Sequence, residues 1–208
     1  MIGSLGVCGL DEAGRGALAG PLVIAAVLMP HGFRFDGYCV GFPVRDSKRL
    51  SPRQRNLLFG LIERQSVRID VEELSVQEIN ERGINWANTE GFRRLIERID
   101  ADQYIVDGRW RLDHLGKRSS RVSCVVHADE FIPPVLAAGI VAKVKRDLIM
   151  RRLHALHPEY AWDSNTGHGT QEHLSALRQY GPCEYHRTQF VMTALKGKGV
   201  DRTTAAGL

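Results

Sequence analysis

The sequence predicts an α/β fold in which a mixed β-sheet is flanked by helices. Its two opening apolar runs, at residues 5–10 and 22–29, are separated by a glycine-rich stretch, a pattern typical of a β-hairpin. Further apolar runs then alternate with segments of helical periodicity, which is typical of strands joined by helical crossovers. With 208 residues, of which 43% are hydrophobic and 25% charged, the chain has the size and composition of one globular domain.

The individual elements follow from apolar periodicity and from the residues that start and stop helices. Strands are expected at residues 5–10, 22–29, 66–71, 104–106 and 122–127. Helices are expected at residues 52–64, 75–82, 85–99, 133–156 and 170–180, with a last short helix ending near residue 195. Ser51 before Pro52 is a typical helix start, and Ser75 with Glu78 has the spacing of a capping box.

Acidic residues follow three of the expected strands. Asp11 and Glu12 end the first strand, Asp107 ends the fourth, and Asp129 lies just past the fifth. Sites form at strand ends in α/β sheets, so these carboxylates converge if the three ends share one edge. Converging carboxylates repel one another and attract cations, and an all-oxygen ligand set suits Mg²⁺ or Mn²⁺ better than zinc.

The same acids have a second interpretation, as ordinary strand-end residues that are solvated or paired with Arg15, Lys48 or Lys143. Neighbouring side chains on a strand also point to opposite faces of the sheet. Asp11 and Glu12 can therefore reach one metal cluster only if the strand ends between them, or if one of them binds through its main-chain carbonyl.

Charge and cysteine content narrow the class of protein. The net charge of +4 comes from residues 143–208, which carry 10 basic and 6 acidic residues, whereas residues 1–142 carry 18 of each. This excess is compatible with a nucleic-acid partner and equally with a solvated surface. Four widely spaced cysteines without a C-x-x-C pair favour reduced thiols over a zinc site. Without a long apolar run or a basic leader, we expect a soluble, cytoplasmic protein with no membrane span.

Several motifs, in their order along the chain, resemble those of ribonuclease HII, the type 2 ribonuclease H family. The most specific is Gly-Leu-Asp-Glu-Ala-Gly-Arg-Gly at residues 9–16, which continues to Ala-Gly-Pro at residues 19–21. The others are Asp-Ser-Lys at 46–48, Asp-Gly at 107–108, Ala-Asp at 128–129, Ala-Lys-Val at 142–144 with Arg146-Asp147, Gly-x-Gly-Thr at 167–170 with His173, and His186-Arg187. The resemblance covers about residues 5–190.

The resemblance implies a ribonuclease H-like fold with a small C-terminal helical extension. We accordingly expect a catalytic domain at residues 1–165, a helical extension packed on it at residues 166–195, and a flexible tail at residues 196–208. The implied activity is an endoribonuclease that cleaves the RNA strand of RNA–DNA hybrids and incises 5′ to ribonucleotides embedded in duplex DNA. Its products would carry 3′-hydroxyl and 5′-phosphate ends, and we expect it to act as a monomer.

By the same resemblance, the catalytic and metal-binding acids are Asp11, Glu12, Asp107 and Asp129. They would hold two Mg²⁺ or Mn²⁺ ions, which can generate a hydroxide and stabilise the departing 3′-oxygen. The expected substrate-binding residues are Gly14, Arg15, Gly16, Lys48, Asn88, Lys143, His168, His186 and Arg187.

The first five members of that substrate set have distinct expected roles. Gly14 and Gly16 would let the main chain approach a ribose 2′-hydroxyl, and Arg15 can reach a phosphate. Lys48 is expected on the phosphate backbone, with a pairing cation as its alternative. Asn88 is expected on the DNA strand, with a solvated helix residue as its alternative.

The later members each keep a structural alternative. Lys143 lies four residues before Asp147, so a plain helical ion pair is possible, although Asp147 could instead support the metal site. His186 and Arg187 could touch phosphate or brace the last helix.

Three features depart from the family pattern. His168 stands where a tyrosine usually stacks on the sugar at the RNA–DNA junction, and imidazole offers less area and a titratable charge. Gly139 stands where a serine is usual, and residues 130–132 lack a lysine often found there. These departures bear on the recognition of single ribonucleotides more than on phosphodiester cleavage. Alternative functions are a structure-selective DNA nuclease or resolvase with the same acids, and a hybrid-binding protein with weakened catalysis.

Overall fold

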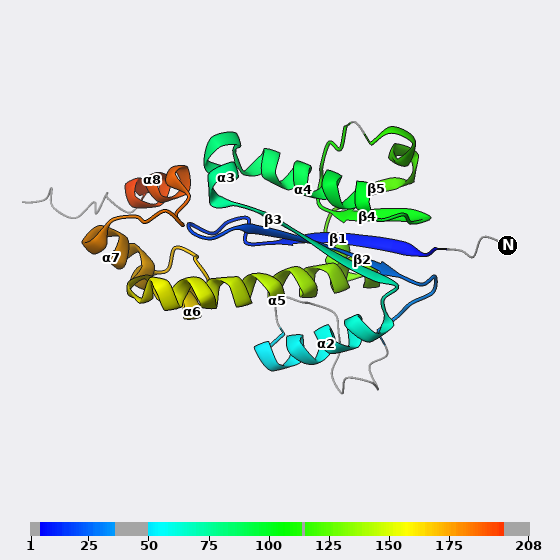
Figure 1. The fold of residues 1–208 in the computed structure, drawn as a ribbon, viewed down its shortest axis with the longest axis horizontal. Helices are drawn as coiled ribbons and strands as arrows, with labels where there is room; N and C mark the ends of the chain where they lie inside the picture. The colour runs from blue at the N-terminus through cyan, green and yellow to red at the C-terminus, as the bar shows by residue number, and fades with distance from the viewer. Residues whose placement is uncertain (1–4, 36–49, 114, 198–208) are drawn as a thin grey trace, which may run out of the picture.

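The computed structural model describes residues 5–35, 50–113 and 115–197, and it has the α/β architecture predicted from the sequence (Figure 1). The strands are β1 (Val7–Ala13), β2 (Leu22–Met29), β3 (Arg68–Leu74), β4 (Gln103–Asp107) and β5 (Val122–Val125). The helices are α2 (Pro52–Gln65), α3 (Val76–Arg82), α4 (Ile84–Arg98), α5 (Pro133–Leu156), α6 (Trp162–Asn165), α7 (Gln171–Tyr180) and α8 (Thr188–Gly197). Short 3₁₀ turns lie at Gly116–Arg121, Ala128–Glu130 and Pro158–Tyr160.

The five described strands form one mixed sheet in the order β3-β2-β1-β4-β5. The β1–β2 and β2–β3 pairs are antiparallel, whereas β1–β4 and β4–β5 are parallel. The opening hairpin is therefore confirmed, and the parallel pairs follow the helical crossovers that the sequence pattern indicated. The strand β1 lies in the middle of the sheet, so its end lies between elements from distant parts of the chain.

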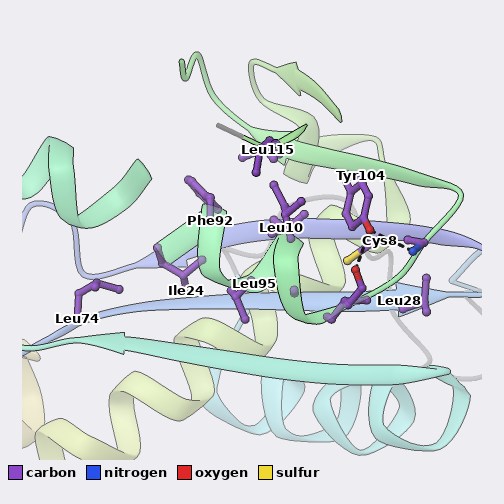
Figure 2. Packing of buried hydrophobic residues seen from close by; sticks show 14 of the residues in the cluster. Cys8, Leu10, Ile24, Leu28, Leu74, Phe92, Leu95, Tyr104 and Leu115 are labelled. Atoms are coloured by element: carbon purple, nitrogen blue, oxygen red, sulfur yellow. Dashed lines mark hydrogen bonds between the residues drawn. The ribbon is translucent and has the colours of Figure 1, made fainter. Parts of the chain in front are cut away.

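Helices cover both faces of the sheet: α3 and α4 lie on one side, and α5 and α2 on the other (Figure 1). Because of this, β2 is buried along its whole length, and its side chains alternate between the two faces. Leu22 and Ile24 pack in the cluster under α4, where Figure 2 shows Leu10, Phe92 and Tyr104, and the intervening residues of β2 pack under α5.

The long helix α5 passes very close to β1. A Cβ atom on Gly9 would lie 2.1 Å from the main-chain carbonyl carbon of Pro134, so only glycine fits at this crossing. Further along α5, a Cβ on Gly139 would lie 2.4 Å from a carboxylate oxygen of Asp11. The close crossing thus places the middle of α5 directly against the first predicted acid.

The C-terminal helices pack in a third cluster, beside the end of α5 (Figure 1). Leu174 and Leu177 of α7 contact a group that includes Tyr160 and Trp162, which our sequence division had placed in the catalytic domain. Leu18 and Ala19, from the loop after β1, belong to the same cluster. The helical extension therefore contacts the loop that carries the most specific motif.

Local signals in the sequence predicted the helix starts well. Ser51 accepts a hydrogen bond from the Gln54 main-chain N–H at 3.3 Å, and the Gln54 side chain accepts from the Ser51 N–H at 2.9 Å. Ser75 and Glu78 form the second capping box. The short helix α6 and the 3₁₀ turns were not predicted, because elements of three to six residues have no periodicity to detect.

Of the five described strands, only β2 has both of its predicted ends. β3 runs over residues 68–74 rather than 66–71, and β4 is one residue longer at each end than expected. β1 continues through Ala13, three residues past the expected end at Leu10, so the strand does not end between Asp11 and Glu12. The strand β5 ends at Val125, two residues earlier than expected. Lys48, Cys39 and the tail from residue 198 onward lie outside the described residues. None of the described helices has the length and hydropathy needed to cross a membrane.

Candidate active site

The sheet brings the four predicted acids to one edge. The parallel pairing of Leu10 with Val106 puts the next residues, Asp11 and Asp107, side by side. The Ala128 main-chain N–H donates to a carboxylate oxygen of Asp107 at 2.8 Å, which ties the turn after β5 to the end of β4. That turn carries Asp129, so β1, β4 and the segment after β5 each contribute acid to the same place.

Burial and mutual repulsion dominate the electrostatics at this edge. Asp11 is 8% exposed and Asp129 is 2% exposed. The pKa of Asp11 is raised well above its ordinary value, first by burial and then by the negative charges of Glu12, Asp107 and Asp129. The Glu12 main-chain N–H donates to Asp11 at 2.7 Å and opposes the rise only in part. A group of four acids, two of them buried, with an all-oxygen donor set is chemically suited to divalent cations.

Two cavities flank the acidic edge, and Glu12 borders both. The first has a volume of about 320 Å³ and is lined by residues that include Asp11, Glu12, Gly14, Lys143, Arg146 and His168. The second, of about 600 Å³, is lined by residues that include Glu12, Arg15, Asn85, Asp107, Arg109 and Trp110. Although Asp11 and Glu12 are neighbours within β1, both therefore reach the same cavity.

The segment at residues 14–21, which we call the glycine loop, lies next to the acids. Gly14 has a φ of +90°, and a Cβ atom there would lie 1.8 Å from the Arg146 Nε. The Arg15 guanidinium donates to the Asn85 side chain at 2.9 Å and lies over the Trp110 ring, 5.1 Å from its centroid. Gly16 has open space around it, so its main chain is accessible.

Two buried arginines organise the glycine loop, and one of them, Arg146, also ties it to residues 165–170, which we call the histidine loop. Arg146 donates to the carbonyl oxygens of Pro21 at 3.1 Å, Ala19 at 3.0 Å and Thr166 at 2.8 Å. Arg187 donates to the carbonyl oxygens of Gly14 at 2.8 Å, Arg15 at 3.0 Å and Gly20 at 3.0 Å. Burial lowers the pKa of Arg146 to about 10 and that of Arg187 to about 9, so both remain cations at neutral pH.

Lys143 and His168 present polar atoms to the first cavity. The Lys143 ammonium lies 2.7 Å from Asp147, so the helical ion pair considered from the sequence is present. His168 is exposed on the histidine loop, and partial burial of its ring, with help from the nearby positive charges of Arg146 and Lys143, lowers its pKa. The imidazole is therefore neutral at physiological pH.

Three expected substrate contacts are inside the protein. Asn88 and Arg187 are 0% exposed and His186 is 2% exposed, so direct contact with substrate is not available to them in this structure. Asn88 is not a solvated helix residue either, because it lies on the buried face of α4. Arg187 braces the glycine loop, and His186 packs among aromatic rings of the C-terminal cluster. The position of Lys48 falls outside the described part of the chain.

The structure also adds residues that sequence reasoning did not single out. Trp110 and Asn85 line the second cavity and contact Arg15, and Arg55 of α2 lines the first. The signal for Trp110 was weak: an aromatic residue within a basic loop just after Asp107. For Asn85 and Arg55 there was none, because both are ordinary polar helix residues that only tertiary packing brings to the site.

Comparison with known proteins gives a consistent result. A family model described as Ribonuclease HII matches residues 8–193. The chain is 40% identical over 193 residues to the Ribonuclease HII of Thermosynechococcus vestitus, covering 91% of this chain and 85% of that protein. The fold is similar to that of the Archaeoglobus fulgidus RNase HII, solved in a complex with PCNA (TM-score 0.76, 28% identity, 89% of this chain and 95% of that one). It is also similar to the ribonuclease H2 of Pyrococcus horikoshii OT3 (TM-score 0.74, 26% identity, 92% and 97%).

Proposed function

Because the chain belongs to the ribonuclease HII family, and is thus a ribonuclease H endonuclease, we propose a specific reaction for it. It cleaves the RNA strand of RNA–DNA hybrids and cuts duplex DNA on the 5′ side of an embedded ribonucleotide. The products carry 3′-hydroxyl and 5′-phosphate ends. The observation that carries this proposal is the group of interacting carboxylates at one sheet edge, directly beside the glycine loop.

Asp11, Glu12, Asp107 and Asp129 would hold the divalent cations, Mg²⁺ or Mn²⁺ and two per site. Bound in this way, two such ions would supply a hydroxide at neutral pH and stabilise the negative charge of the leaving oxygen. The pKa of Asp11 is raised first by burial and then by the negative charges of its neighbours, and a positive charge at the edge would offset both effects, which supports this role.

The protein's own residues then read the substrate. The Gly16 main chain, with no side chain in the way, can hydrogen-bond to a ribose 2′-hydroxyl, and Arg15 next to it can contact a phosphate. Lys143 and His168 face the first cavity, where Lys143 would attract phosphate and the neutral His168 ring would stack on a sugar. We assign Lys48 to the phosphate backbone on the resemblance alone.

Arg187 supports the site from the interior. Arg187 holds the carbonyl groups of Gly14 and Arg15, which fixes the main chain that approaches the ribose. We further propose that the enzyme acts as a cytoplasmic monomer in the removal of ribonucleotides from DNA and in replication.

A cleavage assay tests the proposed reaction with three duplexes: a long RNA–DNA hybrid, a DNA duplex with one ribonucleotide, and an all-DNA branched junction. We expect cleavage of the first two only when Mg²⁺ or Mn²⁺ is present, and none of the third. The Asp11→Asn variant should bind the hybrid yet fail to cut it, because it loses a carboxylate from the metal site. Cutting of the junction would instead indicate a DNA nuclease or resolvase, and equal inactivity of wild type and variant would indicate a binding protein.

A further inference from the structure

We propose that His173 and His186 form a neutral histidine pair that positions the histidine loop, and through it the ring of His168, for substrate recognition. The catalytic consequence of this inference rests on the proposed function. The assignment of the proton to one nitrogen of each ring does not depend on the proposed function.

Two N–H groups that can only donate fix the direction of the hydrogen bonds around the pair. The Cys183 main-chain N–H donates to His186 Nδ1 at 3.0 Å, so this nitrogen carries no proton and Nε2 must carry it. The indole N–H of Trp162 donates to His173 Nε2 at 3.2 Å, so the proton of His173 must be on Nδ1. His186 Nε2 then donates to His173 Nε2 at 3.1 Å, and the single lone pair of this nitrogen is shared between the Trp162 and His186 donors.

The proton of His173 has one acceptor, and it lies in the histidine loop. His173 Nδ1 donates to the main-chain carbonyl oxygen of His168 at 2.9 Å. A chain of hydrogen bonds therefore runs from the Cys183 main chain through two imidazoles to the residue that faces the first cavity. Each ring donates one hydrogen bond, so a second proton on either ring would place two donors against each other.

The surroundings keep both rings neutral. His173 is 0% exposed, and Trp162, which stands against it, is fully buried as well. Burial lowers the pKa of His173, and it lowers the pKa of His186 to about 4 with a contribution from His173.

The titratable groups around the pair come from each element that packs on it. From the segment before α6 these are Tyr160, His157 and Glu159, from the loop before α8 they are Cys183 and Glu184, and from the histidine loop it is His168. The weakly acidic Cys183 thiol, whose pKa is raised by burial, adds no negative charge at neutral pH.

The pair also stands where the two loops of the site meet. Ala19 forms a main-chain bridge with His186, and the N–H of Leu18 donates to the Gly167 carbonyl at 2.8 Å. Arg187, the next residue, holds the glycine loop. Displacing the rings would therefore shift the histidine loop relative to the glycine loop, and with it the spacing of the groups that receive the substrate.

The protonation pattern can be measured directly. Long-range ¹H–¹⁵N correlation NMR on ¹⁵N-histidine-labelled protein distinguishes the two neutral tautomers and the cation. We expect His173 as the Nδ1–H form and His186 as the Nε2–H form across roughly pH 6 to 8, where free imidazole titrates. The opposite tautomer at either ring, or titration of either ring in this range, would overturn the inference whether or not the enzyme is active.

Matched substitutions test the positioning role. In His173→Asn the amide N–H₂ stands where Nδ1 stands and can still donate to the His168 carbonyl, whereas His173→Leu cannot. We expect the KM for a duplex with one ribonucleotide to rise about tenfold in His173→Leu, the value of one lost hydrogen bond, with kcat nearly unchanged. His173→Asn should restore most of this loss.

Equal KM values for the two variants would contradict the positioning role. Wild-type protein that cuts neither the hybrid nor the single ribonucleotide would contradict the proposed function instead, and the NMR result would still stand. If His173→Leu does not fold, the comparison of wild type with His173→Asn and the NMR measurement decide the question.

Discussion

Gly14 is the residue at which local conformation and the site depend on each other most directly. Its φ of +90° favours glycine, and the Arg146 side chain occupies the space where a Cβ atom would lie. Gly16, two residues later, has an ordinary φ and nothing near its missing Cβ. The two glycines look equivalent in the sequence motif, but the structure requires glycine at each position for a different reason. Gly14 is required by its backbone conformation and by Arg146, whereas Gly16 leaves its main chain open to substrate.

Replacing each glycine by alanine distinguishes an effect on stability from an effect on substrate binding. Gly14→Ala should strain the loop and displace Arg146, which costs about 1–3 kcal/mol and lowers the melting temperature by several degrees. Gly16→Ala should leave the melting temperature within about one degree, because nothing is displaced, while it lowers activity on the hybrid. Calorimetry with a cleavage assay checks both, and equal melting shifts for the two variants would contradict this account.

His168 is the second residue with a sharp prediction. Its ring is exposed at the first cavity, where a flat, neutral ring can stack on a sugar. His168→Ala should reduce cleavage at a single ribonucleotide by about tenfold, since a stacked ring is worth about 1–3 kcal/mol, and affect a long hybrid less. His168→Tyr should restore cleavage at the single ribonucleotide. Equal losses on the two substrates would argue against stacking.

For helices and strands, the sequence predicts best those features that depend only on a few adjacent residues. The N-cap at Ser51 and the capping box at Ser75 each depend on a few adjacent residues, and both are present. Ser51 also forms a capping box with Gln54, which was not predicted. The end of β1 is not set by local sequence. Asp11 and Glu12 remain in the strand because they pair with Ala25 and Ile24 of β2, and because α5 packs against Asp11. Two adjacent acids in a sequence predict the end of a strand correctly only when no neighbouring strand or helix pairs with them or packs against them.

The helix α2 offers a test that separates stability from activity. Ser51→Ala removes the side chain that accepts the Gln54 N–H, so it should cost about 1 kcal/mol and lower the melting temperature by about 2–4 °C. Ser51→Asp, which can still cap, serves as the control and should cost little. The kcat/KM of both variants should match wild type, because Ser51 does not line either cavity. A fall in kcat/KM would contradict the separation of stability from activity at this helix start.

For the whole molecule, the sequence predicted that the acids would lie together, but it did not predict that Arg146 and Arg187 would hold the loops of the site. Acidic residues at strand ends appear as a repeated pattern along the chain, and a sheet gathers strand ends. Arg146 and Arg187 instead join loops that are more than a hundred residues apart in sequence, through carbonyl groups that any residue possesses. No local pattern marks such contacts, which is also why Arg187 and His186 looked like surface contacts to substrate.

Because the fold brings several acids together at one edge of the sheet, their burial and mutual repulsion destabilise the folded state. Asp11 binds its proton more tightly in the folded chain than in the unfolded chain, since its pKa is raised by burial and by three neighbouring acids. The folded state therefore holds more protons, and stability falls as pH rises from the ordinary carboxyl pKa of 3.8 through the raised value. Above that window the strain is fully present.

Asp11→Asn should remove this strain at the same time as it removes catalysis. Without divalent cations, we expect the variant to melt about 2–4 °C above wild type at pH 7 for each kcal/mol of repulsion relieved, and the difference to shrink near pH 4. Saturating Mn²⁺ should raise the melting temperature of wild type much more than that of the variant, because binding to the folded state stabilises it in proportion to affinity. Chelation with EDTA should reverse the gain. An Asp11→Asn variant that is less stable than metal-free wild type at pH 7 would mean that hydrogen bonding at this carboxylate outweighs the repulsion of its neighbours.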